Sequence, residues 1–283
     1  MIPVRQANQK LLEVSVVSTS TIAYFGGIAT PVLGNLATAY PNHNQLLIQT
    51  VITAPSLMMA VFSLLSADIT KRFGKKRVFL FACMILLCAG LLPVFLGGLY
   101  FLLTVRFIYG IGFGLAYPLI ILSIMDFFNE EKRVKLVGMA TAIGAASGIF
   151  LQLLGGHLGA NSWRNAFWGY LLIIVIIAFI FFGYPKDKIS VTQPVKKHPS
   201  GFHLKKIFMP SIILSIISFF TSVGMWAFFT NIAIVLTEEK ISDSRGISIL
   251  VGIEAAFVFL SGLSFRFGYS APFVHPERKY LTP

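Results

Sequence analysis

Two charged residues lie inside long apolar stretches of this sequence, where an ionised side chain is costly to bury. Arg106 lies within residues 99–125 and Glu254 within residues 246–265. A charge in the middle of a membrane-spanning helix costs roughly 2.5–3.5 kcal/mol on insertion scales, so such residues usually serve a pathway or a partner. Arg106 is either a functional charge or an arginine held by a structural partner or by the membrane interface. Glu254 is either a proton-binding carboxylate that faces a cavity or a residue at the end of a shorter span.

Uncharged polar side chains inside the apolar stretches form a second group of candidates. Gln152 either lines a cavity or makes a hydrogen bond between two helices. Further candidates for a substrate or proton pathway are Tyr24, Asn35 and Asn231, and Gln49 is a weaker one. Together with the two charged residues, they are the groups that could contact a substrate within the membrane.

Other chemistries leave no pattern in the sequence. The five histidines are scattered, without an H-E-x-x-H pair or a nucleophile elbow, and there is no G-x-x-x-x-G-K-[ST] loop. Cys83 and Cys88 are five residues apart in one apolar stretch, a spacing that suits neither a metal nor a redox pair. We therefore expect no enzyme activity, no metal and no cofactor in this chain.

Membrane-spanning helices must position these candidates. Only 12% of the 283 residues are charged and 56% are hydrophobic, whereas a soluble domain carries about 25% charged residues. A helix needs about 20 mainly apolar residues to cross ~30 Å of hydrocarbon, and its backbone polar groups must pair within the segment. The sequence therefore predicts an all-α membrane protein. Eight segments satisfy this length: 13–37, 46–66, 78–97, 99–125, 134–158, 166–184, 207–236 and 246–265.

Lys and Arg concentrate in alternate connecting segments. With the N-terminus in the cytoplasm, nineteen of the 23 lie on the cytoplasmic side and three outside, while Arg106 lies within a span. Cytoplasmic loops carry such an excess, so we predict a multi-pass protein of a bacterial inner or plasma membrane with a cytoplasmic N-terminus. The scatter of basic residues over short loops argues against nucleic acid as a partner despite the net charge of +12. The lipid bilayer is the expected partner.

A glycine flanked by cations separates the second and third predicted spans. The segment Ala67–Arg77 contains Asp68, Arg72, Gly74, Lys75 and Lys76. We expect a loop from Asp68 to Arg77 whose cations lie on helix ends or on anionic headgroups, with charge that only sets topology as the alternative. The segment resembles the loop between spans two and three of the major facilitator superfamily, with the pattern G-x-L-x-D-[RK]-x-G-[RK]-[RK]. Lys71 occupies the position of the family's aspartate.

Arg106 opens a glycine-rich stretch in the fourth span, followed by Gly110, Gly112 and Gly114. Gly110 and Gly114 are one turn apart, which allows a neighbouring helix to approach closely. The stretch resembles the family's fourth-span motif R-x-x-x-G-x-G-x-G at every position. The resemblance implies that Arg106 takes part in proton coupling or in substrate orientation.

The fifth span carries small residues at helical spacing, which predicts a close-packing face. Its glycines are Gly144, Gly148, Gly155 and Gly156. The span resembles in part the G-x-x-x-G-P-x-x-G-G signature of the family's drug:proton antiporter branch, with Gln152 in the proline position. Beyond it, Trp163, Arg164 and Phe167 match the W-R-x-x-F that often opens the sixth span, and the first two also suit an interfacial anchor.

The resemblance implies a division of the chain. It predicts a six-span N-terminal bundle over residues 1–185, a cytoplasmic linker over 186–206, two spans of a C-terminal bundle over 207–265 and an atypical tail over 266–283. Family members have two six-span bundles with the substrate between them. We therefore expect a truncation or frameshift near residue 264 and a chain that does not transport by itself.

The function that the resemblance implies is secondary active transport of small molecules, as proton-coupled efflux, or an inactive truncated remnant of such a transporter. A small-molecule substrate and protons are the implied partners. The alternative is a membrane-embedded sensor or assembly protein without transport activity.

Overall fold

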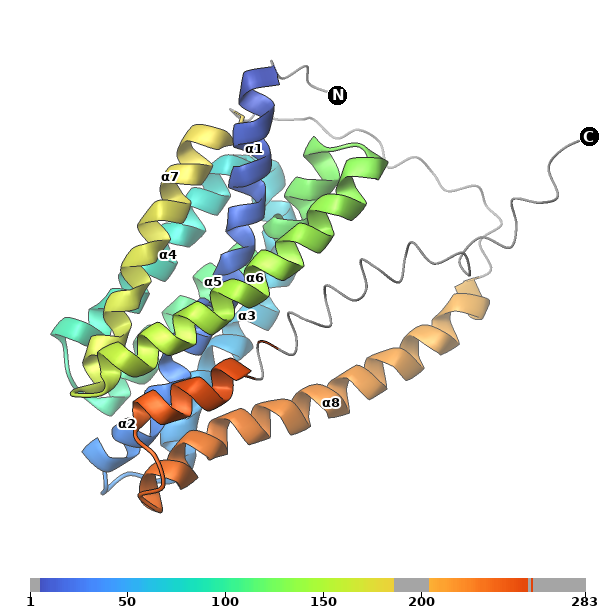
Figure 1. The fold of residues 1–283 in the computed structure, drawn as a ribbon. Coiled ribbons are helices and arrows are strands. Elements are labelled where there is room, and N and C mark those ends of the chain that lie inside the picture. The colour runs from blue at the N-terminus through green and yellow to red at the C-terminus, as the bar shows by residue number, and fades with distance from the viewer. Residues whose placement is uncertain (1–5, 186–203, 254–255, 257–283) are drawn as a thin grey trace, which may run out of the picture.

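The computed structural model describes residues 6–185, 204–253 and 256 of the chain (Figure 1). Every secondary-structure element within these ranges is a helix, in agreement with the all-α fold expected from the sequence. Six helical stretches among the described residues are long and apolar enough to cross a membrane, and they correspond to the first six predicted segments.

The first span changes helix type along its length. Its apolar stretch covers Gln9–Ala39, and its helices are α1 (Gln6–Ser18), the 3₁₀ helix η1 (Thr19–Val32) and α2 (Leu33–Ala39). A 3₁₀ segment of 14 residues is long, because 3₁₀ runs beyond three or four residues are uncommon. Gly26, Gly27 and Pro31 lie within it, and these residue types weaken an α-helix.

The remaining spans alternate in direction and are joined by short turns. They are α3 (Gln45–Phe73), α4 (Lys75–Phe95), α5 (Leu99–Phe127), α6 (Glu130–Gly159), and the pair η2 (Trp163–Leu172) and α7 (Ile173–Gly183). We call the end of the bundle where α3 meets α4 the basic end, and the opposite end, where α4 meets α5, the far end. Helix α1 begins at the basic end.

The loop expected from Asp68 to Arg77 is wrong. Helix α3 continues to Phe73 and α4 begins at Lys75, so Gly74 alone separates them. Gly74 has φ 89°, a left-handed conformation that side-chain-bearing residues rarely adopt. The polar residues on either side stay helical because helices can extend past the hydrocarbon into the headgroup region. A different signal sets the start of α6, where the Asn129 side chain caps the helix by accepting a hydrogen bond from the Lys132 backbone N–H.

Helix α5 is packed between α3 and α4. A methyl group at Gly110 would lie 2.9 Å from the Met58 Cβ of α3, and one at Gly114 would lie 2.8 Å from the Met59 carbonyl oxygen. On the other side, a methyl group at Gly112 would lie 2.9 Å from the Ala82 carbonyl oxygen of α4. The three glycines therefore remove the side chains that would separate these helices.

Large apolar side chains cover the outside of the bundle. Leu64 is 81% exposed, Phe182 is 73% exposed and Tyr100 is 68% exposed. An apolar exterior of this extent requires a lipid solvent, because soluble proteins rarely expose large contiguous apolar patches.

Among the described residues, two further helices follow the first six spans. Helix α8 (Leu204–Glu238) is 35 residues long, and a shorter apolar helix covers Ser244–Ile253. The C-terminal end of α8 packs on the bundle, where α8 contacts α2, α3 and η1. Its N-terminal end lies away from the bundle (Figure 1). Helix Ser244–Ile253 runs along α6, where a methyl group at Gly252 would lie 3.8 Å from both Ile149 and Leu153. Within the predicted span 246–265, residues 254–255 and 257–265 lie outside the described residues.

Candidate functional site

Arg106 lies in the interior of the six-helix bundle, not on its surface. The residue is 2% exposed, and its Nη1 donates a hydrogen bond of 2.9 Å to the Tyr170 hydroxyl of η2. The guanidinium carbon lies 4.9 Å from the centre of the Phe167 ring, 5.5 Å from that of Tyr109 and 5.7 Å from that of Tyr170. Three aromatic faces therefore surround the cation, an arrangement that stabilises a desolvated guanidinium.

The charge of Arg106 is only partly compensated. Its Nε and Nη2 atoms and the Tyr109 hydroxyl are buried without a hydrogen-bond partner among the described residues. The ion pairs of the described chain involve only residues near the basic end, and none includes Arg106. A buried cation without a carboxylate partner stabilises any negative charge that forms nearby, because the low dielectric screens it weakly.

The helices of the first and fifth spans meet along the predicted glycine face of α6. Methyl groups at Gly144 and Gly148 would lie 2.6 Å and 2.7 Å from the Tyr24 ring of η1. One turn away, the Thr21 and Ser147 hydroxyls form a hydrogen bond of 2.9 Å. Tyr24 thus rests on the two glycines.

Gln152 faces the same helix. A methyl group at Gly27 would lie 3.3 Å from the Gln152 Nε2 atom, and the Gln152 Oε1 atom is buried without a hydrogen-bond partner among the described residues. The amide therefore has an unused acceptor on the η1–α6 contact. Nearer the far end, a methyl group at Gly155 would lie 3.0 Å from the Ile28 carbonyl carbon, and Gly156 meets Ser244 and Ser248.

Asn35 and Asn231 both lie near the far end and contact different helices. The Asn35 Nδ2 donates to the Gly159 carbonyl at 3.1 Å and to the Ser244 hydroxyl at 2.7 Å. The Asn231 Oδ1 accepts a hydrogen bond of 2.9 Å from the Gln49 Nε2. Among the residues that the structure describes, the partners of Arg106 are Tyr109, Phe167 and Tyr170, and none of these is another pathway candidate.

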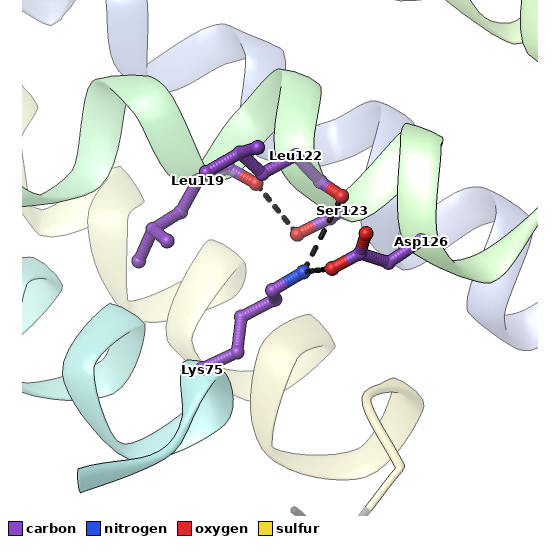
Figure 2. A network of polar contacts seen from close by, with 5 residues as sticks. All are labelled: Lys75, Leu119, Leu122, Ser123 and Asp126. Carbon is purple, nitrogen blue, oxygen red and sulfur yellow. Dashed lines mark hydrogen bonds and ion pairs between the residues drawn. The ribbon is translucent and has the colours of Figure 1, made fainter. Parts of the chain in front are cut away.

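At the basic end, the cations after Gly74 lie on the C-terminal ends of two helices. Lys75 donates to the Leu122 carbonyl of α5 at 3.3 Å and forms an ion pair with Asp126 (Figure 2). Lys76 donates to the Phe181 and Tyr184 carbonyls at the end of α7, at 2.6 Å and 2.7 Å. Cations are favourable near the C-terminal end of a helix because that end carries partial negative charge. The Phe181 carbonyl is also one of the last carbonyls of α7, which have no partner within the helix.

The other residues of this motif that the structure describes lie on α3, and the one contact given for them is with a residue of the same helix. Asp68 pairs with Lys71 within the same helix at 3.0 Å, and both side chains are mostly exposed. Arg72 is exposed in the last turn of α3. Glu254 lies outside the described residues. In the described part of the chain, no group of three or more His, Cys, Asp or Glu side chains could hold a metal ion.

Sequence reasoning missed several residues that complete these contacts. Tyr170 lies one turn after Phe167, so its aromatic side chain at helical spacing could have identified it as a partner of Arg106. Asp126 could have been found as an acid at the basic end of the fourth span. Ser244 carries no comparable signal, because its contact with Asn35 joins residues 209 positions apart.

Comparisons with known proteins give one consistent family. The model of the Major Facilitator Superfamily matches residues 15–275, which extends past residue 264. A major facilitator superfamily multidrug transporter, mfsC of Aspergillus fumigatus, is 30% identical over 161 residues, covering 53% of this chain and 31% of that protein. Multidrug resistance protein MdtL of Shigella flexneri is 22% identical over 227 residues, covering 76% of this chain and 54% of that protein. The chain thus matches about a third to a half of these relatives' lengths.

Solved structures share the fold. A bacterial homologue of the human lysosomal transporter Spinster, in an inward-facing and unoccupied conformation, aligns over 97% of this chain and 66% of its own with a TM-score of 0.71 and 15% identity. A D-xylose–proton symporter aligns over 90% of this chain and 68% of its own, with a TM-score of 0.59 and 16% identity.

Proposed function

We infer the function from one premise: this chain belongs to the Major Facilitator Superfamily. We propose that it performs secondary active transport of small organic molecules, as efflux coupled to protons. The multidrug transporters among its relatives support efflux, and the proton symporter that shares its fold supports protons as the coupling ion. We also propose that residues 1–185 form the N-terminal bundle, 186–206 a linker, 207–265 the start of a second bundle and 266–283 a tail.

The proposed orientation places the basic end in the cytosol of a bacterial inner or plasma membrane, with the N-terminus on that side. It follows from the nineteen Lys and Arg residues of the sequence assigned to this side and three to the other.

The observation that carries proton coupling is the buried Arg106, whose Nε and Nη2 atoms have no hydrogen-bond partner within the described part of the chain. We propose that it acts as a fixed positive charge that makes proton release from a nearby carboxylic acid easier. Glu254 is the proposed acid from its place in the sequence. Gln152, with its unused acceptor facing η1, is the proposed polar contact for the substrate.

Transport can be tested with the purified chain in proteoliposomes that carry a pH gradient, with the fluorescent cation ethidium as the probe. The sequence led us to expect a chain that does not transport by itself, so this assay decides between that expectation and the proposal. Transport by the chain would appear as accumulation that depends on the gradient and falls at least tenfold in Arg106→Leu. Thr104→Ala is the matched control, because Thr104 lies on the same helix and its hydroxyl bonds only the Tyr100 carbonyl of its own helix. A folded chain without flux would overturn transport and favour a remnant or a non-transporting sensor or assembly protein. Equal flux in Arg106→Leu would overturn the role of the arginine.

A further inference from the structure

One edge of the Arg106 guanidinium makes no hydrogen bond to the described residues. The Nη1 atom donates to Tyr170, whereas Nε and Nη2 have no partner among the residues that the structure describes. Nε and Nη2 lie on the same edge of the planar group, so their N–H bonds point in nearly parallel directions and form a fork that can bind an anion at two points. Because the side chain is 2% exposed, this fork lies inside the six-helix bundle.

The Tyr109 hydroxyl is a further donor on the same side of α5. Tyr109 follows Arg106 by three residues, so the two side chains share a face of the helix, and the guanidinium carbon lies 5.5 Å from the centre of the Tyr109 ring. The hydroxyl is buried and has no hydrogen-bond partner in the described part of the chain. One positive charge is thus combined with three buried atoms whose N–H or O–H groups are unused, which is costly unless a ligand accepts from them.

The aromatic rings around Arg106 are held in place by their own packing. Tyr170 rests on Gly90 of α4, where an added methyl group would lie 2.6 Å from the Tyr170 ring. The ring centres of Phe25 and Phe167 each lie 6.0 Å from that of Tyr170. Close packing of this kind keeps side chains in one rotamer, so the unused donors belong to a preorganised site.

A small anion satisfies these groups better than water does. Arginine has N–H donors and no acceptor, and the Tyr109 oxygen is the one acceptor among the three unpartnered atoms, so a water molecule that accepted from the fork would have few acceptors for its own protons. A buried cation is also costly without an opposite charge, and no ion pair of the described chain includes Arg106. We propose that the Nε and Nη2 edge of Arg106, together with the Tyr109 hydroxyl, binds one small monovalent inorganic anion such as chloride.

The bound anion is the counter-ion of Arg106. An ionised carboxylate that came close to the guanidinium would compete for the same N–H groups, so the anion and the carboxylate are alternative partners of this fork. The anion site lies within one bundle and involves no step of transport. The inference therefore goes beyond the proposed function and does not rest on it.

Anion binding can be measured through the thermal unfolding of the purified chain in detergent. The unfolding midpoint is recorded at increasing concentrations of sodium chloride, with sodium gluconate added to keep the ionic strength constant. A ligand that binds only the folded chain raises the midpoint by an amount that grows with its concentration relative to the dissociation constant. At a chloride concentration ten times the dissociation constant, we expect the midpoint to lie about 3–6 °C higher than in gluconate alone.

Variants locate the site within the chain. Arg106→Gln should abolish the chloride-dependent shift, and Tyr109→Phe should raise the dissociation constant for chloride on the order of tenfold, because a hydrogen bond to a charged group is lost. Two matched controls should behave like the parent chain. Tyr100→Phe removes the hydroxyl of an exposed tyrosine on the same helix, and Arg164→Gln removes a cation whose guanidinium lies over the Trp163 ring and not at the site.

Equal midpoints in chloride and in gluconate would overturn the anion site, as would a shift that persists in folded Arg106→Gln or disappears instead in Arg164→Gln. If Arg106→Gln does not fold, Tyr109→Phe decides, and an unchanged dissociation constant in this variant counts against the site. A shift that appears only after Glu254→Gln would show that this carboxylate already neutralises Arg106, which also overturns the proposal. A chloride-dependent midpoint without ethidium flux would overturn transport and leave the anion site in place.

Discussion

The contact between α3 and α5 should tolerate no added methyl group at Gly110. A Cβ atom at this position would lie 2.9 Å from both the Pro55 Cα and the Met58 Cβ, and closer still to the Pro55 carbonyl oxygen. Real Cβ atoms essentially never approach other heavy atoms within 3.0 Å. Since two of the three neighbours are backbone atoms, Gly110→Ala must move α3 rather than rotate a side chain.

The cost follows from two opposing effects. Overpacking a well-packed interior destabilises by about 1–3 kcal/mol, whereas replacing glycine by alanine inside a helix stabilises by up to about 1 kcal/mol. We expect a net loss of about 1–2 kcal/mol in the free energy of unfolding. Thermal unfolding of the purified chain in detergent should report it as a lower midpoint, at about 2–4 °C per kcal/mol.

Gly138→Ala in α6 is the matched control, because nothing lies within 4 Å of an added Cβ there. It should leave the midpoint unchanged or raise it slightly. The reasoning is refuted if Gly110→Ala unfolds at the same temperature as the parent chain, or if Gly138→Ala loses as much stability as Gly110→Ala.

Three further predictions concern the polar contacts. Tyr170→Phe should destabilise the chain by about 1–3 kcal/mol, because it removes the hydrogen bond to the buried Arg106; an unchanged unfolding midpoint would contradict the assigned contact. In a double-mutant cycle, Lys75→Met and Asp126→Asn should show a coupling of no more than about 1 kcal/mol, since the Asp126 side chain is 59% exposed although that of Lys75 is 13% exposed; a larger coupling would contradict this. Lys76→Ala should speed amide hydrogen exchange at the end of α7, because two carbonyls lose their donor; equal exchange in the parent would refute the capping role.

The spans were predictable from the sequence because lipid imposes a length and a composition on them. The predicted segment 99–125 became a helix at Leu99–Phe127, and 13–37 became Gln9–Ala39. The ends were less predictable. Hydropathy marks where the apolar stretch stops, whereas the helix stops where a cap or a glycine stops it, as Gly74 does at the basic end.

The candidate site was predictable only in part. Arg106 was identifiable because a charge in an apolar stretch needs an explanation. Its enclosure by Phe167 and Tyr170 was not, because it depends on how the sixth span packs on the fourth. The 3₁₀ conformation of η1 was also not predicted, since an apolar pattern of this length fits either helix type.

All the contacts of Arg106 described above come from α5 and η2, which lie in the same six-helix bundle. If that bundle rocks as one solid piece, the guanidinium carries its aromatic surroundings with it and is stationary in their frame. Its electrostatic field within the bundle would then be the same in both conformations of the proposed transport cycle. What would change between the two conformations is the distance from the Arg106 guanidinium to an acid outside the bundle. Coupling of protons to transport would then depend on the motion of that acid and not on any change at the arginine.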